Sequence, residues 1–491
     1  MEKPLEEISE ILQHRIDKLK KLKEKNVNPY PYNFKRTHAS TEIIGNFEKL
    51  ESEQAEVKIA GRIVSLRLHG KSLFAHLKDG SGKIQIYVKS DEVGKDKFEL
   101  FDLFDIGDFL GVTGKVFKTK TGEITVRVDD FVLLSKSMLP LPEKWHGLQD
   151  KELRYRQRYV DLIVNEEVKN VFLFRTNLIK TMRQFLDDRG FVEVETPILQ
   201  PLYGGAFARP FVTHHNALDV DLYLRIADEL YLKRLIVGGF EKVYEISKSF
   251  RNEGMDRNHN PEFTMLELYQ AYADYNDIME LYESLLNYSA QQVLGSNKFE
   301  FEGNQIDLTP PFKRIPMLES IREHAQVDLS DKNEEEIRKI ASGLNVKENL
   351  NRPKGKLIEA VFEIQVQPRL IQPTFVTDYP VEMSPLAKYH REKPGLTERF
   401  ELFIGGCEMG NAFSELNDPQ DQRERFRQQA ELAKRGDEEA QVLDEDFIRA
   451  LEYGMPPTGG LGFGVDRLVM ILTNTRSIRD VIFFPQMRPE E

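Results

Sequence analysis

The residues most able to do chemistry gather in one stretch, Val243 to Tyr272. Its ends are rich in β-forming residues and its middle carries Gly, Asp, Asn and Pro, which predicts two strands joined by a loop. The second strand alternates between an apolar face and a face of aromatic and polar side chains. Antiparallel pairing would collect these groups on one face: Arg251, Glu253, Phe263, Glu267 and Tyr269. His259 would lie on the loop above this face. The alternative is a hairpin face whose charges simply meet water.

A pair of glutamates indicates a metal site further along the chain. If a tight hairpin turns at residues 404–405, Glu401 and Glu408 lie directly opposite each other. Like charges in that position repel, so a buried pair needs a cation between them. Carboxylates together with phosphate oxygens are the ligands that Mg²⁺ prefers. Two exposed glutamates are the alternative that the spacing alone leaves open.

The strand after this pair carries further polar and aromatic residues at alternate positions: Asn411, Phe413 and Glu415. Glu408 is an odd number of residues from each of them, so a regular strand would turn it to the opposite face. A bulge or kink at Gly410 is therefore predicted, which would bring all four residues to one face.

A glycine-rich strand near the C-terminus is a candidate floor for a ligand. Glycines at alternate positions from 460 to 464 would let a flat ligand approach the backbone. A helix is expected to begin near Asp466, with Arg467 in its first turn. Val465 occupies the place of the third glycine of a dinucleotide fingerprint, which argues against that motif.

Composition bounds the class of protein that must position these groups. The chain has 491 residues, of which 40% are hydrophobic and 30% charged, as is ordinary for a globular protein of several domains. No apolar run approaches the length of a membrane span, and the N-terminus lacks the apolar core of a signal peptide. The single cysteine, Cys407, excludes an internal disulfide and a cysteine-rich zinc site and suits a reducing cytosol. The net charge of −13 argues against a non-specific nucleic-acid binder.

The N-terminal part predicts a small β-barrel. Residues 1–53 read as an amphipathic helix followed by a linker, and residues 54–137 as three strands, a helix and two strands. That order is typical of the OB-fold, a barrel that often binds single-stranded nucleic acid. The alternation turns Phe74 and Gln85 outward, where they could stack one base and bond its edge. A phenylalanine that merely covers a barrel end is the alternative.

The remaining chain predicts an α+β domain with a mostly antiparallel sheet flanked by helices. Residues 138–154 read as a linker and residues 155–491 as the second domain, with a helical segment around 313–367. Before the opening stretch we expect a helix from Val171 to Arg189, a strand from Phe191 running into Pro197, and a helix near Ala227.

Three of these tracts together identify a family. Phe-Arg-Asn-Glu followed by His-Asn-Pro-Glu-Phe, at 250–263, resembles motif 2 of the class II aminoacyl-tRNA synthetases. The helix, strand and Pro197 resemble motif 1, which forms the dimer interface in that family. The glycine strand and Arg467 resemble motif 3. Over nearly its whole length the chain resembles the bacterial lysyl-tRNA synthetases of subclass b, including the hinge tract that begins at Lys144.

The resemblance implies roles in binding ATP. Arg251 would meet the α-phosphate, and His259 and Arg467 the β- and γ-phosphates. Phe263 and Arg467 would sandwich the adenine, whose edge Glu253 would read. Glu401 and Glu408 would hold Mg²⁺, with up to three ions per active site and Glu415 as a further candidate ligand. No zinc is expected.

A lysine pocket follows partly from charge. Glu229, Glu267 and Glu415 would bring several negative charges together, which suits a substrate with two amines. The resemblance assigns Glu229 to the α-amine and Glu267, Tyr269 and Glu415 to the ε-amine. It completes the pocket with these residues: Gly205, Arg251, Asn411 and Phe413. Asp228 stands where the family commonly has proline.

The implied reaction activates L-lysine with ATP and transfers it to tRNA(Lys) in the cytoplasm, without a membrane. Phe74 and Gln85, and by resemblance Arg67 and Glu123, would read a U-rich anticodon. A homodimer through the motif 1 region is implied as well.

Three alternatives stay open. A truncated relative lysylates an elongation factor, but residues 54–137 argue against it. An aspartate or asparagine synthetase needs a different pocket from a cluster of glutamates. The third alternative is an inactive relative that only binds tRNA. The intact residues Arg251, Glu401, Glu408 and Arg467 argue against it, because such a protein does not need them.

Overall fold

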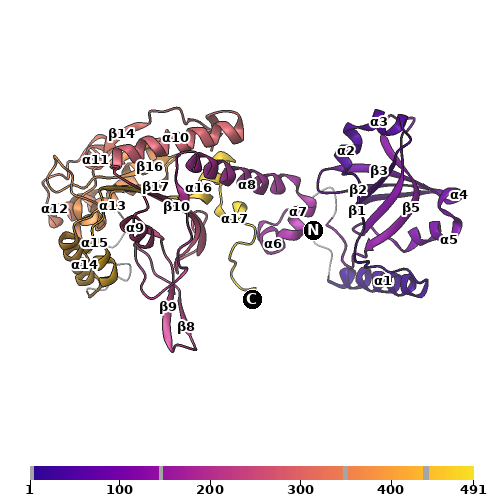
Figure 1. Ribbon diagram of the computed structural model, residues 1–491, viewed down its shortest axis with the longest axis horizontal. Helices are drawn as coiled ribbons and strands as arrows, with labels where there is room; N and C mark the ends of the chain where they lie inside the picture. The colour runs from indigo at the N-terminus through magenta and orange to yellow at the C-terminus, as the bar shows by residue number, and fades with distance from the viewer. Residues whose placement is uncertain (1–4, 143–147, 345, 347–351, 435–441, 491) are drawn as a thin grey trace. The chain divides into compact units, whose positions relative to one another are not determined.

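The computed structural model describes residues 5–142, 148–344, 346, 352–434 and 442–490. These residues form two compact units, Met1–Gln149 and Asp150–Glu491, drawn in Figure 1. No described helix is long and apolar enough to cross a membrane. Residues 143–147 of the expected linker lie outside the described residues.

The first unit contains the predicted barrel. Within residues 5–142, five strands close in the order β1-β2-β3-β5-β4, so the OB-fold prediction is confirmed. Its inward positions are buried as the alternation predicts: Leu73 and Ile86 are 0% exposed. The strands have these bounds: β1 Glu56–His69, β2 Ser72–Lys78, β3 Lys83–Lys89, β4 Phe109–Lys118 and β5 Ile124–Ser135.

The helix expected inside the barrel region is broken into pieces. Gly94 has a φ of +86°, outside the helical range, so the chain turns there instead of continuing one helix. The helical elements of this unit are α1 Leu5–Glu24, α2 Ser40–Gly45, α3 Phe47–Ser52, α4 Ser90–Val93, α5 Lys95–Phe98 and η1 Glu99–Leu103. Arg15 of α1 donates to the carbonyl oxygens of Ser137 and Ile106 at 3.1 Å each, which fixes α1 on the barrel.

The second unit is built on a mixed, mostly antiparallel sheet, as predicted. In the described residues eight strands follow the order β14-β15-β16-β17-β18-β11-β10-β6, and only the outermost pair at each end is parallel. The strands are β6 Val192–Glu193, β10 Lys242–Phe250, β11 Glu262–Ala271, β14 Lys313–Pro316, β15 Thr374–Thr377, β16 Arg399–Ile404, β17 Cys407–Ser414 and β18 Thr458–Gly464.

Helices cover one face of this sheet and leave the other for a ligand. Leu266 and Leu268 of β11 are fully buried in a core shared with α8 Glu166–Asp187, α10 Tyr275–Leu294 and α16 Val465–Leu472. These helices lie against the sheet in Figure 1. Because side chains alternate along a strand, the residues between those leucines face the opposite side.

Further helices and short strands enclose the sheet. The helices are α6 Lys151–Arg156, α7 Arg158–Val164, α9 Glu229–Val237, α11 Met317–Ala325, α12 Glu334–Gly343, α13 Lys354–Gln365, η2 Gln367–Arg369, η3 Val381–Met383, α14 Pro419–Lys434, α15 Glu445–Glu452 and α17 Ile478–Val481. The strands are β7 Leu199–Gln200, β8 Val212–His215, β9 Val220–Leu224, β12 Lys298–Phe301 and β13 Asn304–Asp307.

Two predicted boundaries were wrong. The strand expected from Phe191 into Pro197 is shorter, because only Val192 and Glu193, which form β6, pair with β10; β7 begins after Pro197. The helix expected near Ala227 begins at Glu229, after Asp228 as its N-cap residue.

Candidate active site

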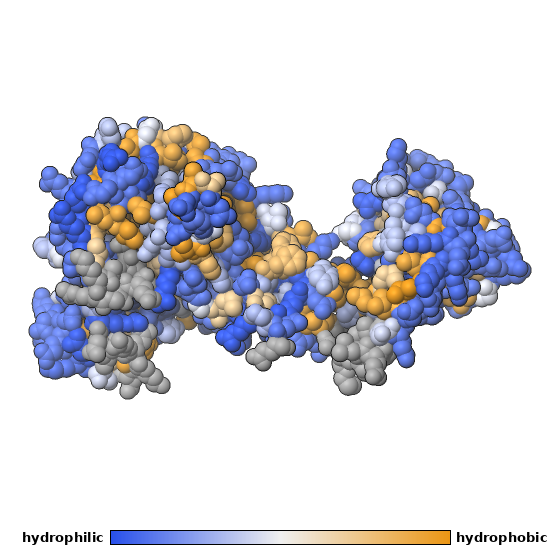
Figure 2. All heavy atoms as spheres, turned by 90° about the horizontal axis from the view of Figure 1, so that it is seen from below, coloured by the Kyte–Doolittle hydropathy of each residue, from blue (hydrophilic) through white to orange (hydrophobic). Residues whose placement is uncertain are grey.

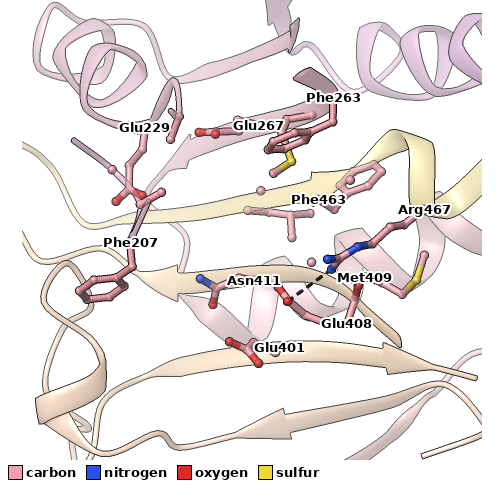
Figure 3. A pocket seen from close by; sticks show the side chains of 18 of the residues that line it. Phe207, Glu229, Phe263, Glu267, Glu401, Glu408, Met409, Asn411, Phe463 and Arg467 are labelled. Atoms are coloured by element: carbon pink, nitrogen blue, oxygen red, sulfur yellow. Dashed lines mark hydrogen bonds and ion pairs between the residues drawn. The ribbon is translucent and has the colours of Figure 1, made fainter. Parts of the chain in front are cut away.

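A cavity of about 350 Å³ opens on the uncovered face of the sheet. Its walls come from β11, β16, β17 and β18, from the loop before β11, and from the first turns of α9 and α16. Figure 3 shows Phe263 and Arg467 near one end of this cavity and Glu229 near the other. Every site residue predicted for this unit lines it: Gly205, Glu229, Arg251, Glu253, His259, Phe263, Glu267, Tyr269, Glu401, Glu408, Asn411, Phe413, Glu415 and Arg467.

The β10–β11 hairpin has the predicted antiparallel register. Ser249 pairs with Phe263, and the Arg251 amide donates to Pro261 at 2.8 Å, so Arg251 and Phe263 share a face. The Arg251 guanidinium lies 5.0 Å from the centre of the Phe263 ring. Its Nε is buried without a hydrogen-bond partner among the described residues. Burial lowers the pKa of Arg251, and Glu253 and Glu408 oppose that effect. A buried cation with a free donor suits an anionic ligand.

The β16–β17 hairpin differs from the prediction in its register. The turn falls at Gly405 and Gly406, both with positive φ, and not at 404–405. Glu401 therefore pairs with Asn411, and Glu408 with Phe403, so the two glutamates are not directly opposite. The glycines decide this, because two consecutive residues with positive φ make the tightest hairpin turn.

The predicted irregularity is present one residue earlier than expected. The pairing passes from Phe403–Glu408 to Leu402–Gly410, which leaves Met409 as the extra residue of a bulge. The bulge changes the parity of β17, so that Glu408 and Asn411 both reach the cavity.

Glu401 is held by two residues that the sequence analysis missed. It accepts hydrogen bonds from Tyr379 Oη at 2.8 Å and Arg399 Nη2 at 2.6 Å. Burial raises the pKa of Glu401 to about 7; Arg399 opposes this and Glu408 adds to it. Arg399 could have been found, because it lies two residues before Glu401 on one strand and so shares its face.

Two acidic oxygen ligands that repel each other fit a divalent cation. Within the described ranges, no three His, Cys, Asp or Glu residues gather as a metal site. The role of Glu415 as a further metal ligand stays a prediction. Its carboxylate lies 2.5 Å from the ammonium nitrogen of the buried Lys233.

The glycine strand β18 and α16 complete the phosphate end. Arg467 donates to the Glu408 carbonyl oxygen at 2.7 Å and lies 3.4 Å from its carboxylate (Figure 3). Arg467 also approaches His259 Nε2 at 3.5 Å, so the two predicted phosphate-binding residues lie together. Gly460 must be glycine, because a Cβ there would stand 2.1 Å from Glu415 Oε1 and 2.4 Å from the Tyr269 ring.

The opposite end of the cavity is acidic and buried. Glu229, Glu267 and Glu415 are 6%, 4% and 1% exposed. Burial raises the pKa of Glu267, and the charges of Asp228 and Glu229 raise it further. Tyr269 Oη donates to Glu267 at 3.5 Å. Such groups gain most from a bound cation, because burial has removed their water.

Asp228 contributes to this end through its backbone. Its N–H donates to Glu267 Oε1 at 3.2 Å. Proline, which the family commonly carries there, has no such donor. The Asp228 carboxylate is buried against Arg225, and burial is the main cause that raises its pKa to about 6.

Lys233 was also missed by the sequence analysis. It is fully buried and bridges two of the pocket glutamates, Glu229 and Glu415. Its position four residues after Glu229 in a predicted helix was the available signal, since residues four apart share a helix face.

The barrel brings its predicted base-reading residues together from β1, β2, β3 and the turn before β5. Arg67 pairs with Phe74 across strands. Gln85 Nε2 donates to Glu123 at 2.7 Å, and Gln85 Oε1 accepts from the Thr125 hydroxyl at 2.8 Å. His76 contacts Glu123 at 2.8 Å, and Tyr87 packs on Phe74 with ring centres 4.8 Å apart. A ring beside an oriented amide can stack a base and hydrogen-bond its edge.

Comparison with known proteins agrees with this geometry. Residues 150–488 match the family of tRNA synthetases class II (D, K and N), and residues 57–134 match the OB-fold nucleic acid binding domain. The chain belongs to the class II tRNA synthetases.

Its curated relatives define the branch of that class. The chain is 60% identical over 489 residues to the lysine–tRNA ligase of Pelotomaculum thermopropionicum, covering 99% of this chain and 96% of the relative. It is 58% identical to that of Carboxydothermus hydrogenoformans, with 99% of each chain covered. It is 59% identical to that of Thermoanaerobacter pseudethanolicus, with 99% and 97% covered. The chain thus falls among the lysine–tRNA ligases of bacteria.

Proposed function

We propose that this protein activates L-lysine with ATP and then transfers it to tRNA(Lys). The proposal rests on one observation: a cationic site and an acidic site lie in the same cavity. A cationic end, with Arg251 and Arg467, suits a triphosphate, and an acidic end, with Glu267 and Glu415, suits a diamino acid. The close relatives named lysine–tRNA ligase support the same substrate.

In the first step an oxygen of the lysine carboxylate attacks the α-phosphorus of ATP. A bond from that oxygen to phosphorus forms, the bond to the bridging oxygen breaks, and pyrophosphate leaves with the electron pair. No general base is needed, because the carboxylate is already ionised. Arg251 stabilises the α-phosphate, and His259 and Arg467 neutralise the β- and γ-phosphates, so positioning and charge account for the acceleration.

The same residues place the nucleotide. Phe263 stacks on the adenine from one side and Arg467 from the other, and Glu253 reads its edge. Glu401 and Glu408 would hold Mg²⁺, up to three ions with the help of phosphate oxygens and water. When bound, Mg²⁺ supplies positive charge to the triphosphate. The donors are oxygens, which suits magnesium better than zinc.

The acidic end orients the amino acid. Glu229 receives the α-ammonium group, and Glu267, Tyr269 and Glu415 receive the ε-ammonium group. The other residues proposed around lysine are Gly205, Arg251, Asn411 and Phe413. An arginine side chain fits poorly, because its planar fork needs a different spacing of acceptors.

In the second step a hydroxyl of the terminal ribose of tRNA attacks the lysyl carbonyl carbon, and AMP leaves. The barrel would read a U-rich anticodon with Phe74 stacking a base and Gln85 bonding its edge, beside Arg67 and Glu123. We accordingly divide the chain into a helix and linker (1–53), an anticodon-binding domain (54–137), a linker (138–154) and a catalytic domain (155–491) with a helical segment around 313–367.

We also propose a cytoplasmic homodimer formed through the motif 1 region. β6 is an edge strand with an unpaired side. Large apolar side chains on and after α8 are exposed, including Leu173 at 52% and Val192 at 46%. Orange apolar areas interrupt the blue surface of the second unit in Figure 2. Sedimentation of the protein tests this: a monomer at micromolar concentration would contradict it.

The test of function is ATP–pyrophosphate exchange with a panel of amino acids, followed by charging of tRNA(Lys). We expect exchange with lysine alone and lysylation of that tRNA. Exchange with aspartate or asparagine, or none with any amino acid, would contradict the proposal. Exchange with lysine without charging would reject the tRNA step.

A further inference from the structure

A buried lysine stands behind the acidic end of the cavity. Lys233 lies on α9 one turn after Glu229 and is 0% exposed. Glu229 and Glu415 line the cavity, whereas Lys233 does not. The ammonium group is therefore enclosed by protein and reaches the ligand only through the carboxylates in front of it.

The contacts of Lys233 fix both carboxylates. Its Nζ lies 2.5 Å from Glu229 Oε1 and 2.5 Å from Glu415 Oε2. The rings of Tyr269 and Phe447 have their centres 5.9 Å from the same nitrogen. The contact with Glu229 is a charge-assisted hydrogen bond and that with Glu415 an ion pair, and together they hold the two carboxylates beside one buried cation.

The lysine is charged in this setting. Burial alone lowers the pKa of an amine, but Glu229 and Glu415 outweigh it and raise the pKa of Lys233. Lys233 thus places a positive charge against two of the pocket carboxylates. Burial raises the pKa of Glu415 to about 8, and the charge of Lys233 opposes that rise.

The contacts of Glu415 show which of its two carboxylate oxygens is left for a ligand. Oε2 forms an ion pair with Lys233 at 2.5 Å without hydrogen-bond geometry, and Oε1 is buried with no ion-pair or hydrogen-bond partner in the described part of the chain. Oε1 lies over Gly460, which lines the same cavity. Glu415 is 1% exposed, and this oxygen accepts no hydrogen bond although it lies at the cavity wall. A hydrogen-bond donor of the substrate would therefore satisfy it.

We infer that Lys233 is a specificity-determining positioning residue, which clamps Glu229 and Glu415 so that Glu415 presents Oε1 to the terminal ammonium group of the substrate. The inference rests on the proposed function, since it takes lysine as the substrate. It concerns selection by side-chain charge and not the phosphate chemistry at the other end of the cavity.

The test compares two substrates in wild type and Lys233→Met. Lysine and norleucine have side chains of similar length, but norleucine lacks the terminal amine. ATP–pyrophosphate exchange gives kcat/KM for each. We expect the lysine-to-norleucine ratio of kcat/KM to fall at least tenfold in Lys233→Met, mainly through KM for lysine, while KM for ATP changes less than threefold. A lysine that only supports the fold would lower both substrates together and leave the ratio unchanged.

Two further variants keep the test decisive. Lys233→Met leaves Glu415 as an unpaired buried charge and could unfold the pocket, so Lys233→Met with Glu415→Gln removes that charge as well. We expect the double variant to bind ATP normally, which shows that the cavity stays folded without Lys233. Lys339→Met is the matched control, because Lys339 also pairs with a glutamate one turn earlier, Glu335, but on an exposed helix.

The outcomes separate the inference from the function. A wild type without lysine exchange would reject the proposed function. A wild type active with lysine, together with an unchanged lysine-to-norleucine ratio in a Lys233→Met variant that binds ATP normally, would overturn the role of Lys233 alone.

Discussion

At the scale of single residues, the cavity works through carboxylates whose burial is nearly complete. Glu267 is 4% exposed, and its partners before a ligand arrives are one backbone amide and a phenol. Removing solvent makes such a group costly unless a cation binds it. The energy of lysine binding therefore depends on few residues, each of which can be tested singly.

Glu267→Gln should raise KM for lysine by roughly a hundredfold to several thousandfold. The change leaves the substrate ammonium group without its charged partner, a cost of about 3 to 5 kcal/mol. KM for ATP should hold within a fewfold. Glu262→Gln is the control, since Glu262 lies on the same strand but is exposed and outside the cavity. Equal effects of both variants on lysine would refute the assignment.

Asp228→Asn should move the acid limb of the pH profile of kcat/KM for lysine to lower pH. Glu267 must be ionised to bind an ammonium group, and burial first, then the charge of Asp228, raises its pKa. Removing that charge lowers the pKa, so ionisation persists to lower pH. Asparagine retains the backbone N–H, and Arg225 keeps Glu245 as a partner at 2.7 Å. An acid limb that stays in place or moves to higher pH would contradict the prediction; the ATP profile is the control.

At the scale of elements, the alternation of strands predicted most of the site. The period of two placed Phe263, Glu267 and Tyr269 on one face of β11, and the structure has them there. The turn of the β16–β17 hairpin was misplaced by one residue, because Gly405 and Gly406 take positive φ together and period alone does not locate a turn.

Other features depended on packing that a sequence pattern does not contain. Tyr379 reaches Glu401 from a loop 22 residues away in the chain. In the sequence Lys233 is one of several polar residues of a predicted helix. Only the structure shows that it is buried between Glu229 and Glu415. The mismatch of parity between Glu408 and Asn411, by contrast, was visible in the sequence and correctly indicated a bulge.

Gly460→Ala tests the close packing of β17, β18 and β11. The added Cβ would meet Glu415 Oε1 at 2.1 Å, so we expect a loss of about 1 to 3 kcal/mol in unfolding free energy and a weaker affinity for lysine. Gly464→Ala, whose Cβ would find its nearest neighbour at 3.7 Å, should cost less. Thermal denaturation and lysine titration measure both. Equal stability of the two variants would show that the strand yields and that Gly460 is not required.

At the scale of the whole molecule, our proposal gives each unit its own ligand: tRNA for the barrel, and ATP with lysine for the larger unit. The closed barrel presents rings and amides, and the larger unit encloses the cavity. The order of strands predicted the barrel, because its turns and alternation are local features. The large sheet pairs strands that lie far apart in the sequence. Periodicity does not predict such pairing, so the expected sheet rested on the resemblance to the family.

Phe74→Ala should impair tRNA charging without affecting lysine activation. Loss of one stacked base costs about 1 to 3 kcal/mol, so KM for tRNA should rise roughly tenfold to a hundredfold. Exchange of pyrophosphate should be unchanged, because the barrel contributes nothing to the cavity lining. Tyr32→Ala, which removes a fully exposed ring from the same unit, is the control. A normal KM for tRNA in Phe74→Ala would remove that residue from the anticodon site.

The most direct measurement is a crystal structure of the protein with lysine and a non-hydrolysable ATP analogue. The account predicts the ε-ammonium group within hydrogen-bond distance of Glu267 and of Glu415 Oε1, and the carboxylate directed toward Arg251 and the α-phosphate. Lysine bound with its side chain away from these two glutamates, or with its ammonium group in solvent, would contradict it.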